Sequence, residues 1–176
     1  MLLLPFEEKN PTIHPSVFLA KGSLVSGDVT IGEDSSVWYN SVIRGDIAPT
    51  VIGKRVSVQD NSTLHQSPDN PLVIEDDVTI GHNAVLHSCI VRKGALIGMG
   101  SIILDKAEIG EESMVAAGAV VPPGMKIPPR TLVVGSPAKV KRELTEAELL
   151  DFVRIRKSYV DKGKIYRQAE LNPLSR

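Results

Sequence analysis

The sequence predicts an all-β solenoid of stacked short strands followed by a C-terminal α-helix. Only 4% of the 176 residues are aromatic although 42% are hydrophobic, so the core must be built from small aliphatic side chains. Isoleucine, leucine or valine recurs at six-residue intervals over most of the chain, and a pattern typical of a helix begins only after residue 144. Units of six residues are too short to bury a face alone and must stack on their neighbours.

The six-residue repeat begins at Ile13 and ends at Val133. The stretch from Val91 to Val133 keeps the interval without interruption, and three changes of frame connect it to the earlier part of the chain. The repeat positions, called anchors below, are Ile13, Leu19, Val25, Ile31, Val37, Ile43, Ile52, Val58, Leu64, Ile74, Ile80, Leu86, Val91, Ile97, Ile103, Ile109, Val115, Val121, Ile127 and Val133.

A small or β-branched residue lies four positions after most of the anchors. These residues are Val17, Ser23, Val29, Ser35, Ser41, Val56, Ser62, Val78, Ala84, Ala95, Ser101, Ala107, Ser113, Ala119 and Thr131. Each hexapeptide is therefore predicted to form a short strand and a turn, with one large and one small side chain directed inward. The pattern covers about residues 11–138, so we assign residues 1–138 to the solenoid domain.

These repeats resemble the hexapeptide-repeat family, whose members fold as left-handed parallel β-helices. The resemblance implies that three hexapeptides form one triangular coil of 18 residues. It also supplies the handedness, because the general rule for parallel crossovers would give the opposite hand.

The remaining residues, 139–176, are predicted to form a linker and a helix. Thr145 and Glu148 have the spacing of a capping box, in which a threonine and a glutamate satisfy the first backbone amides of a helix. Apolar residues then follow at helical intervals from Leu149 to Val160. We expect a helix over about 145–160, with an extension towards 169, that packs on the β-helix or on a neighbouring subunit. Its mixed charges argue against a membrane-surface helix.

Composition and charge exclude several functional classes. The net charge of −1 provides no basic field of the kind that nucleic acids or anionic lipids attract. The single cysteine, Cys89, rules out a disulfide framework or a paired-cysteine zinc site, and we expect it to be a small buried filler. No apolar stretch of about 18 residues occurs, and the first residues lack the basic start of a signal peptide. These features predict a cytoplasmic protein without nucleic-acid or membrane partners.

The histidines offer a candidate metal site. His65 and His87 each follow an anchor directly, and they lie 22 residues apart, which is one coil plus a four-residue insertion. They should therefore stack on one face in adjacent coils, about 4.8 Å apart, where two imidazoles can share one metal ion. His82 belongs to the preceding face and should lie around a corner from the other two, so a neighbouring subunit in a threefold assembly could supply it. Three nitrogen ligands with one open position are typical of a catalytic zinc. We expect His14 to be structural.

Several longer motifs resemble the gamma-class carbonic anhydrase family, some of whose members are labelled ferripyochelin-binding or transferase-like. The matching segments are Trp-Tyr-Asn-Ser-Val-Ile-Arg-Gly-Asp at 38–46, Val-Gln-Asp-Asn-Ser-Thr-Leu-His at 58–65, Ile-Gly-His-Asn-Ala-Val-Leu-His at 80–87, Ile-Gly-Met-Gly at 97–100 and Gly-Ser-Pro-Ala-Lys at 135–139.

The resemblance implies a homotrimer with a metal at each subunit interface. His65 and His87 would come from one chain and His82 from the next, with zinc as the metal and cobalt or iron(II) as alternatives. The implied reaction is the reversible hydration of CO2 to bicarbonate by a metal-bound hydroxide. The residues that match other family positions are Gln59, which would hydrogen-bond the metal-bound water, Arg44 and Asp60, an ion pair across the interface, Asp46, an acidic partner beside them, and Tyr159, which would overhang the metal.

The sequence departs from the family pattern at two places. Efficient members carry a proton-shuttling glutamate in the loop after the first ligand histidine, and the corresponding loop at 66–71 has no glutamate here, although Asp69 could substitute. A family asparagine after the helix tyrosine is replaced by Asp161. We therefore expect CO2 hydration to be slow or absent. Two alternatives stay open: an acyl- or CoA-handling enzyme of the hexapeptide-repeat type, and a non-catalytic trimer that binds a metal or an iron siderophore.

Overall fold

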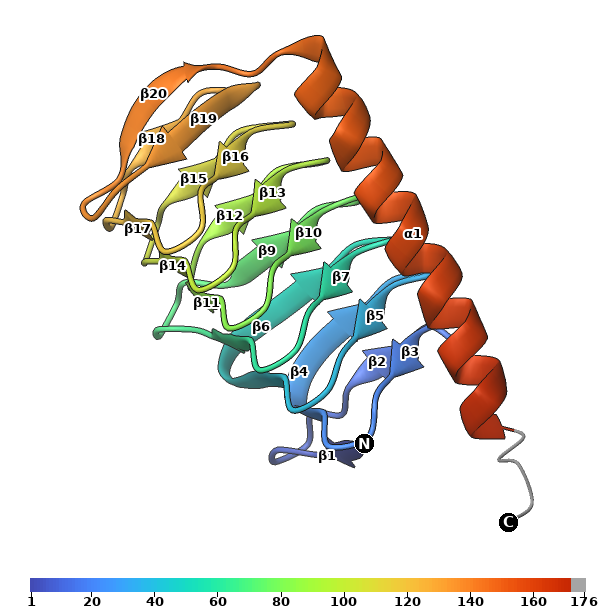
Figure 1. Cartoon of the computed structure of the whole chain (residues 1–176). Helices are drawn as coiled ribbons and strands as arrows, with labels where there is room; N and C mark the ends of the chain where they lie inside the picture. Colours follow the sequence, from blue (N-terminus) through green and yellow to red (C-terminus); the bar gives the residue numbers. More distant parts are fainter. Residues whose placement is uncertain (172–176) are drawn as a thin grey trace.

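The computed structural model describes residues 1–171, with side chains to residue 169. It confirms the predicted fold class: the chain forms a left-handed parallel β-helix of triangular cross-section, and the helix α1 (Glu146–Leu171) lies along one side (Figure 1). Among these residues no helix is apolar over a length sufficient to span a bilayer.

The strands form three faces. The helix face, which carries α1, contains β3 (Phe18–Leu19), β5 (Ser36–Val37), β7 (Ser57–Val58), β10 (Thr79–Ile80), β13 (Leu96–Ile97), β16 (Met114–Val115), β19 (Thr131–Val134) and β20 (Lys139–Glu143). The histidine face contains β1 (Leu2–Leu4), the first halves of β4 (Leu24–Ile31) and β6 (Val42–Ile52), β8 (Thr63–His65), β11 (Val85–His87), β14 (Ile102–Ile103) and β17 (Val120–Val121). The third face contains β2 (Thr12–Ile13), the second halves of β4 and β6, β9 (Leu72–Ile74), β12 (Ile90–Val91), β15 (Glu108–Ile109) and β18 (Lys126–Ile127).

The core is built from the two repeat positions that the sequence indicated. Nineteen of the twenty anchors are buried, and Ile13, in the first coil, is partly buried. All fifteen small residues that follow them are buried as well. Buried serines at these positions satisfy their hydroxyl groups on backbone carbonyls, as Ser41 does on Gln59 (2.8 Å) and Ser62 on Gly81 (3.1 Å). A polar group can be buried at low cost when it is hydrogen-bonded in this way.

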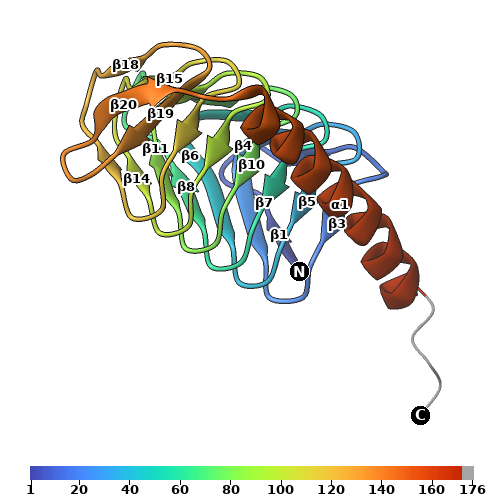
Figure 2. The same ribbon diagram turned by 45° about the horizontal axis from the view of Figure 1, so that its top comes forward.

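Helix α1 begins with the predicted capping box and packs across the first coils. The Thr145 amide donates to Glu148 Oε2 at 2.9 Å, and the Glu148 amide donates to Thr145 Oγ1 at 3.3 Å. From there α1 runs back along the helix face towards the N-terminal end of the solenoid (Figure 2). Its Tyr159 meets the Trp38 ring edge-on, with centroids 5.5 Å apart, and Trp38 packs in turn on Phe18. Aromatic contacts of this kind fix where α1 lies on the β-helix.

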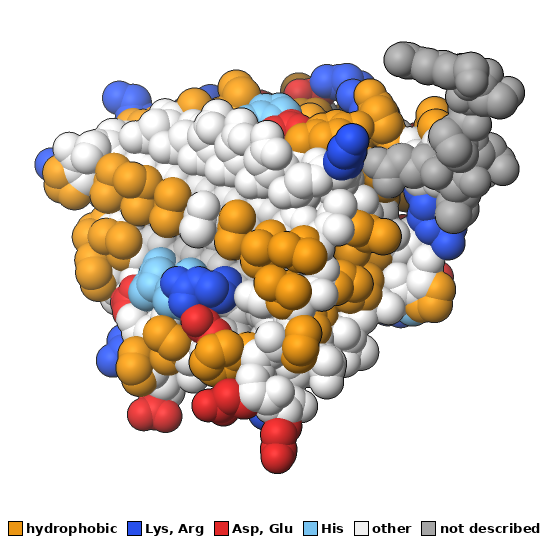
Figure 3. Space-filling view, turned by 90° about the horizontal axis from the view of Figure 1, so that it is seen from below, with side chains coloured by type: hydrophobic (Ala, Val, Ile, Leu, Met, Phe, Trp, Pro, Cys, Tyr) orange, Lys and Arg blue, Asp and Glu red, His pale blue; other side chains and the backbone are white. Residues whose placement is uncertain are grey.

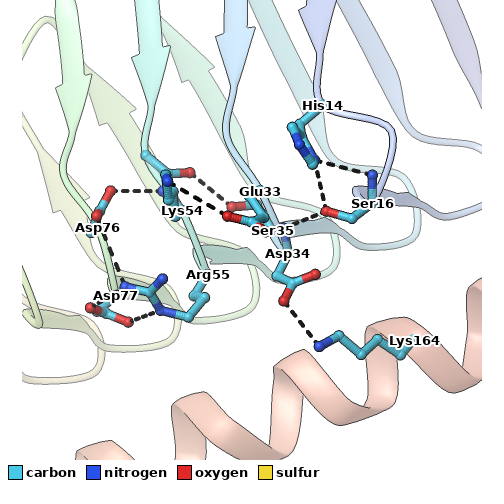
Figure 4. Close-up of polar contacts among 11 residues, drawn as sticks. His14, Ser16, Glu33, Asp34, Ser35, Lys54, Arg55, Asp76, Asp77 and Lys164 are labelled. Atoms are coloured by element: carbon cyan, nitrogen blue, oxygen red, sulfur yellow. Dashed lines mark hydrogen bonds and ion pairs between the residues drawn. The ribbon is translucent and has the colours of Figure 1, made fainter.

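Ion pairs along one corner of the solenoid connect it to α1. Figure 4 shows Asp34 reaching Lys164 of the helix, with Oδ2 and Nζ 3.0 Å apart. In the same figure the guanidinium of Arg55 donates to both carboxylate oxygens of Asp77, at 2.7 and 2.8 Å. Arg156 of α1 adds a hydrogen bond to the backbone carbonyl of Asp77 at 3.1 Å. The helix is therefore held by charges at the corner as well as by aromatic packing.

Two strands lie where the six-residue repeat gave no indication of a strand. Residues 139–143, expected to be linker, form the strand β20, which pairs antiparallel with β19. Every residue of β20 is exposed, so its sequence has no buried positions from which a strand could be recognised. Near the other end β1 pairs with β4 although its leucines are at least 38% exposed. Both segments lie outside the hexapeptide pattern, and both add backbone pairing to strands of the repeat.

Candidate metal centre

The histidine face brings two imidazole rings together at the ends of β8 and β11. His65 and His87 are direct partners in the strand register, and His65 Nδ1 lies 3.2 Å from His87 Nε2. The expected stacking of these two residues is therefore present in the structure. Seen from the N-terminal end, histidine side chains reach the surface beside basic and acidic groups (Figure 3).

Each ring directs its other nitrogen at a carboxylate. His65 Nε2 lies 3.0 Å from Asp46 Oδ1, and His87 Nδ1 lies 2.6 Å from Asp105 Oδ1. Asp46 is also paired with Arg44. Burial raises the pKa of Asp46, but the hydrogen bonds from Arg44 and His65 outweigh it, so the pKa lies below its ordinary value. The pKa of Asp105 is lowered by hydrogen bonds from Ser67 and His87. Both carboxylates are therefore suited to accept a hydrogen bond from an imidazole N–H.

This arrangement fits two ligands of one metal ion. A histidine that binds a metal usually donates its other N–H to a carboxylate, which fixes the tautomer and orients the ring. With the N–H groups of both rings on the carboxylates, His65 Nδ1 and His87 Nε2 present lone pairs to each other. Two nitrogens bound tetrahedrally at about 2.0–2.1 Å would lie roughly 3.3–3.4 Å apart, close to the 3.2 Å observed. Within residues 1–169 of a single chain, no third histidine, cysteine or carboxylate completes a metal-binding group with them.

His82 lies at the edge of the helix face, in a turn, and not on the histidine face. It follows β10, where its Nδ1 is 2.7 Å from Asp60 Oδ2 and its side chain is 36% exposed. Gln59, which is almost fully buried, and Tyr159 of α1 line a cavity of about 400 Å³ together with His82. Burial and the charge of Asp60 raise the pKa of Tyr159. The chain thus carries two separate clusters, one with His65 and His87 and the other with His82, Gln59 and Tyr159.

The structure also places the other residues that the sequence singled out, Arg44, Asp60, His14 and Cys89. Arg44 and Asp60, expected as partners across an interface, pair within the chain with Asp46 and His82 respectively, and their contact between subunits stays a prediction. His14 is exposed and bonded to Ser16. Cys89 is fully buried in the hydrophobic core, and this burial raises the pKa of its thiol.

Sequence reasoning did not identify Asp105 and Ser67, although both contact the site. Asp105 lies 18 residues after His87, but the coil here has only 17 residues because Leu86 pairs with Ile103, so only a search that allowed an offset of one residue would have placed Asp105 near the ring. Ser67 offers no comparable signal, because it lies in the loop at 66–71 where the repeat is interrupted.

Comparison with known proteins agrees with this fold and with these motifs. The family model for bacterial transferase hexapeptides (six repeats) matches residues 10–45 and 88–123. A carbonic anhydrase of Geobacillus kaustophilus is 61% identical over 94% of this chain and 91% of its own length. The mitochondrial gamma carbonic anhydrase 2 of Arabidopsis thaliana is 38% identical over 90% of this chain and 59% of its own.

A solved structure from Bacillus cereus, described as a candidate acetyltransferase, superposes with a TM-score of 0.94 at 57% identity, and the match covers 95% of this chain and 97% of that one. Family labels therefore divide between carbonic anhydrase and transferase, while the fold is shared. With 61% identity to a carbonic anhydrase over nearly the whole chain, and with the repeat and the motifs described above, this protein belongs to the gamma-class carbonic anhydrase-like family of hexapeptide-repeat proteins.

Proposed function

We propose that the protein is a metal-dependent carbonic anhydrase that hydrates CO2 reversibly to bicarbonate. The observation that carries this proposal is the pair of facing imidazole nitrogens, 3.2 Å apart, each on a ring whose other nitrogen is bonded to a carboxylate. Such a pair supplies two of the three ligands of a three-histidine site. The carbonic anhydrase relatives support the same chemistry.

The third ligand in this proposal is His82 of a neighbouring subunit in a homotrimer. His82 is partly exposed and lies in the turn after β10 rather than on the histidine face, so a closed trimeric ring can bring one subunit's His82 to the next subunit's pair. Zinc is the metal we propose, and cobalt or iron(II) would bind the same imidazole set, since imidazole suits all three.

The side chains around the site have distinct proposed roles. A metal held by the three histidines would supply Lewis acidity, which lowers the pKa of water to about 7. Gln59 is buried beside His82, where its carboxamide can orient that water by a hydrogen bond. The cavity wall contributed by Met99 and Met114 is apolar and suits CO2, an uncharged molecule without a strong hydrogen-bonding group. Tyr159 covers the same cavity from α1.

The loop at 66–71 contains no glutamate that could carry protons out of the site. Its Asp69 is exposed, and Ser67 and Asn70 form a bridge that closes the loop onto itself. We therefore propose slow hydration that small buffers accelerate by carrying protons out of the site. Fast turnover in a buffer too bulky to enter the site would contradict this interpretation of the loop.

The test is metal analysis followed by a stopped-flow CO2 hydration assay on the intact protein. We expect about one zinc per chain after gel filtration and a hydration rate that rises with imidazole concentration. His87→Ala should lose both metal and activity, whereas His14→Ala, a matched control with an exposed histidine, should keep both. Stoichiometric metal without hydration would favour the non-catalytic metal- or siderophore-binding trimer.

An acyl- or CoA-handling enzyme is the second candidate, because a close structural relative is described as a candidate acetyltransferase. Enzymes of that type typically rely on one catalytic histidine and need no metal. Absence of bound metal together with transfer from an acyl-CoA would favour this candidate. The cytoplasmic location stays a prediction.

A further inference from the structure

Asp105 is placed to control the geometry of His87. It follows β14, and its side chain reaches across to the end of β11, where Oδ1 lies 2.6 Å from His87 Nδ1. Its second oxygen, Oδ2, accepts a hydrogen bond from Ser67 Oγ at 2.5 Å. Both carboxylate oxygens are therefore in use, and the carboxylate has little freedom to rotate away from the ring.

Ser67 is itself held in place by the next coil. Its backbone amide donates to Ser88 Oγ at 2.6 Å, and the Ser88 hydroxyl donates to the carbonyl of Asn70 at 2.7 Å. Ser88 is almost fully buried. The loop at 66–71 is thus fastened to the solenoid directly behind the histidine pair, and Ser67 connects it to Asp105. The loop that follows His65 is therefore connected, through Ser67 and Asp105, to the ring of His87.

We propose that Asp105 is a positioning residue that keeps the proton of His87 on Nδ1 and presents Nε2 to the metal, with Ser67 holding the carboxylate in place. This inference rests on the proposed function. A carboxylate partner raises the basicity of a ligand histidine and fixes its orientation, and loss of such a partner typically weakens metal binding by about 10–100-fold. A ring without it can rotate or place its proton on Nε2, towards His65.

The first measurement is zinc affinity by competition with a chelator, on the intact protein. Asp105→Ala should weaken zinc binding by about 10–100-fold. Asp105→Asn keeps an acceptor oxygen without the charge and should restore part of that loss. Ser67→Ala should weaken binding in the same direction by a smaller factor. Asp28→Ala, a control that removes a carboxylate paired with Lys9, should bind zinc as the unmodified chain does.

The second measurement is independent of metal and activity. In 15N-labelled apo-protein at a pH about two units above the ordinary histidine pKa near 6.5, the 15N shift of His87 Nδ1 should be that of a protonated nitrogen. In Asp105→Ala it should move towards the unprotonated value, and Asp105→Asn should restore it. A merely structural contribution of Asp105 would lower thermal stability without changing which nitrogen carries the proton.

The outcomes separate this inference from the proposed function. Unchanged zinc affinity and an unchanged His87 Nδ1 shift in Asp105→Ala would overturn the positioning role while leaving the metal site intact. If the unmodified chain bound no zinc, the proposed function would fail, and the 15N comparison alone would decide the role of Asp105. If Asp105→Ala does not fold, Asp105→Asn and Ser67→Ala carry the same two measurements.

Discussion

Each hexapeptide directs two side chains into the core, and the space at each of these positions limits the size of the side chain that fits there. Along β9, Ile74 is buried while Val73, the neighbouring residue, points outward and is only partly buried. Ile74 is stacked on Ile52 and Val91 in the adjacent coils. A side chain removed here leaves a space that coils above and below cannot fill, because their backbones are fixed by the parallel ladder.

Shortening Ile74 should therefore destabilise the protein strongly. We expect Ile74→Ala to lower the free energy of unfolding by about 2–5 kcal/mol, as cavity-forming substitutions in cores do. Val73→Ala, one residue away on the outer surface, should cost less than about 1 kcal/mol. Denaturant unfolding of both variants measures the difference. Equal losses would mean that the solenoid does not distinguish inner from outer positions.

At the scale of elements, the contact between α1 and the β-helix depends on charge at one corner. Asp77 is bonded to Arg55 and lies 3.6 Å from Arg156 of α1, and its side chain is 13% exposed. The hydrogen bonds from Arg55 and the charge of Arg156 hold the pKa of Asp77 below its ordinary value, although burial raises it. Ionised Asp77 therefore stabilises the folded chain.

Because the folded pKa is lowered, this stabilisation is complete above the unfolded value near 3.8 and is lost as the pH falls through the folded value. We expect Asp77→Asn to reduce stability by about 1.5–3 kcal/mol at pH 7 and to flatten the decline in stability below pH 4. Asparagine tolerates the positive φ of 66° at this position, so the change removes the charge and one of the two oxygens that accept from Arg55 without straining the backbone. Thermal unfolding from pH 7 to pH 3 measures both effects, and parallel curves for the two proteins would contradict this assignment.

Helix α1 covers the aromatic cluster but contributes little to the repeat core. Chain truncation after Leu144 keeps β20 and removes α1 with Tyr159. We expect the shortened protein to keep the circular dichroism of its β-structure and to bind zinc, because the repeat carries its own core. CO2 hydration should change, and solubility should fall because Phe18 and Trp38 become exposed. Loss of the β-signal would show that α1 is required for folding.

Elements that bury side chains at regular intervals could be predicted from the sequence, and elements that bury few could not. The anchors repeat every six residues because each coil buries them, so the solenoid, its core and the stacking of His65 on His87 could be derived from spacing. No side chain of β20 is buried, and few are buried at the far end of α1, so these sequences carry no such period. Asp105 contacts His87 across a coil that is one residue short of the regular frame. A search based on the anchors therefore did not find it.

At the scale of the whole molecule, one cluster lies on the histidine face and the other at the edge of the helix face, so the metal site that we propose would need two chains. His65 and His87 lie on the histidine face, and His82 lies beside α1 with Gln59 and Tyr159. A trimeric ring would contain three directed contacts, each joining the first cluster of one subunit to the second cluster of its neighbour.

Complementation between two inactive variants tests this arrangement. Trimers of His82→Ala and trimers of His87→Ala should each lack a complete site. After they are unfolded and refolded together, one of the three contacts in each mixed trimer joins an intact pair to an intact His82. Zinc retained through gel filtration should therefore return in part on mixing. If verified mixed trimers hold no zinc, His82 is not supplied by the neighbour.

Strand β20 limits the end-to-end association of copies of the chain along the solenoid axis. A parallel β-helix ends in strands whose free amides and carbonyls could template the first coil of another copy, and repeated addition would give a filament. Here β20 runs against β19 in the opposite direction, and the Ala138 amide donates to the carbonyl of Val120 at the edge of β17. Charged residues of β20, among them Lys141 and Arg142, face solvent along that end. Two of the three strand edges at this end are thus covered, which disfavours head-to-tail polymerisation through it.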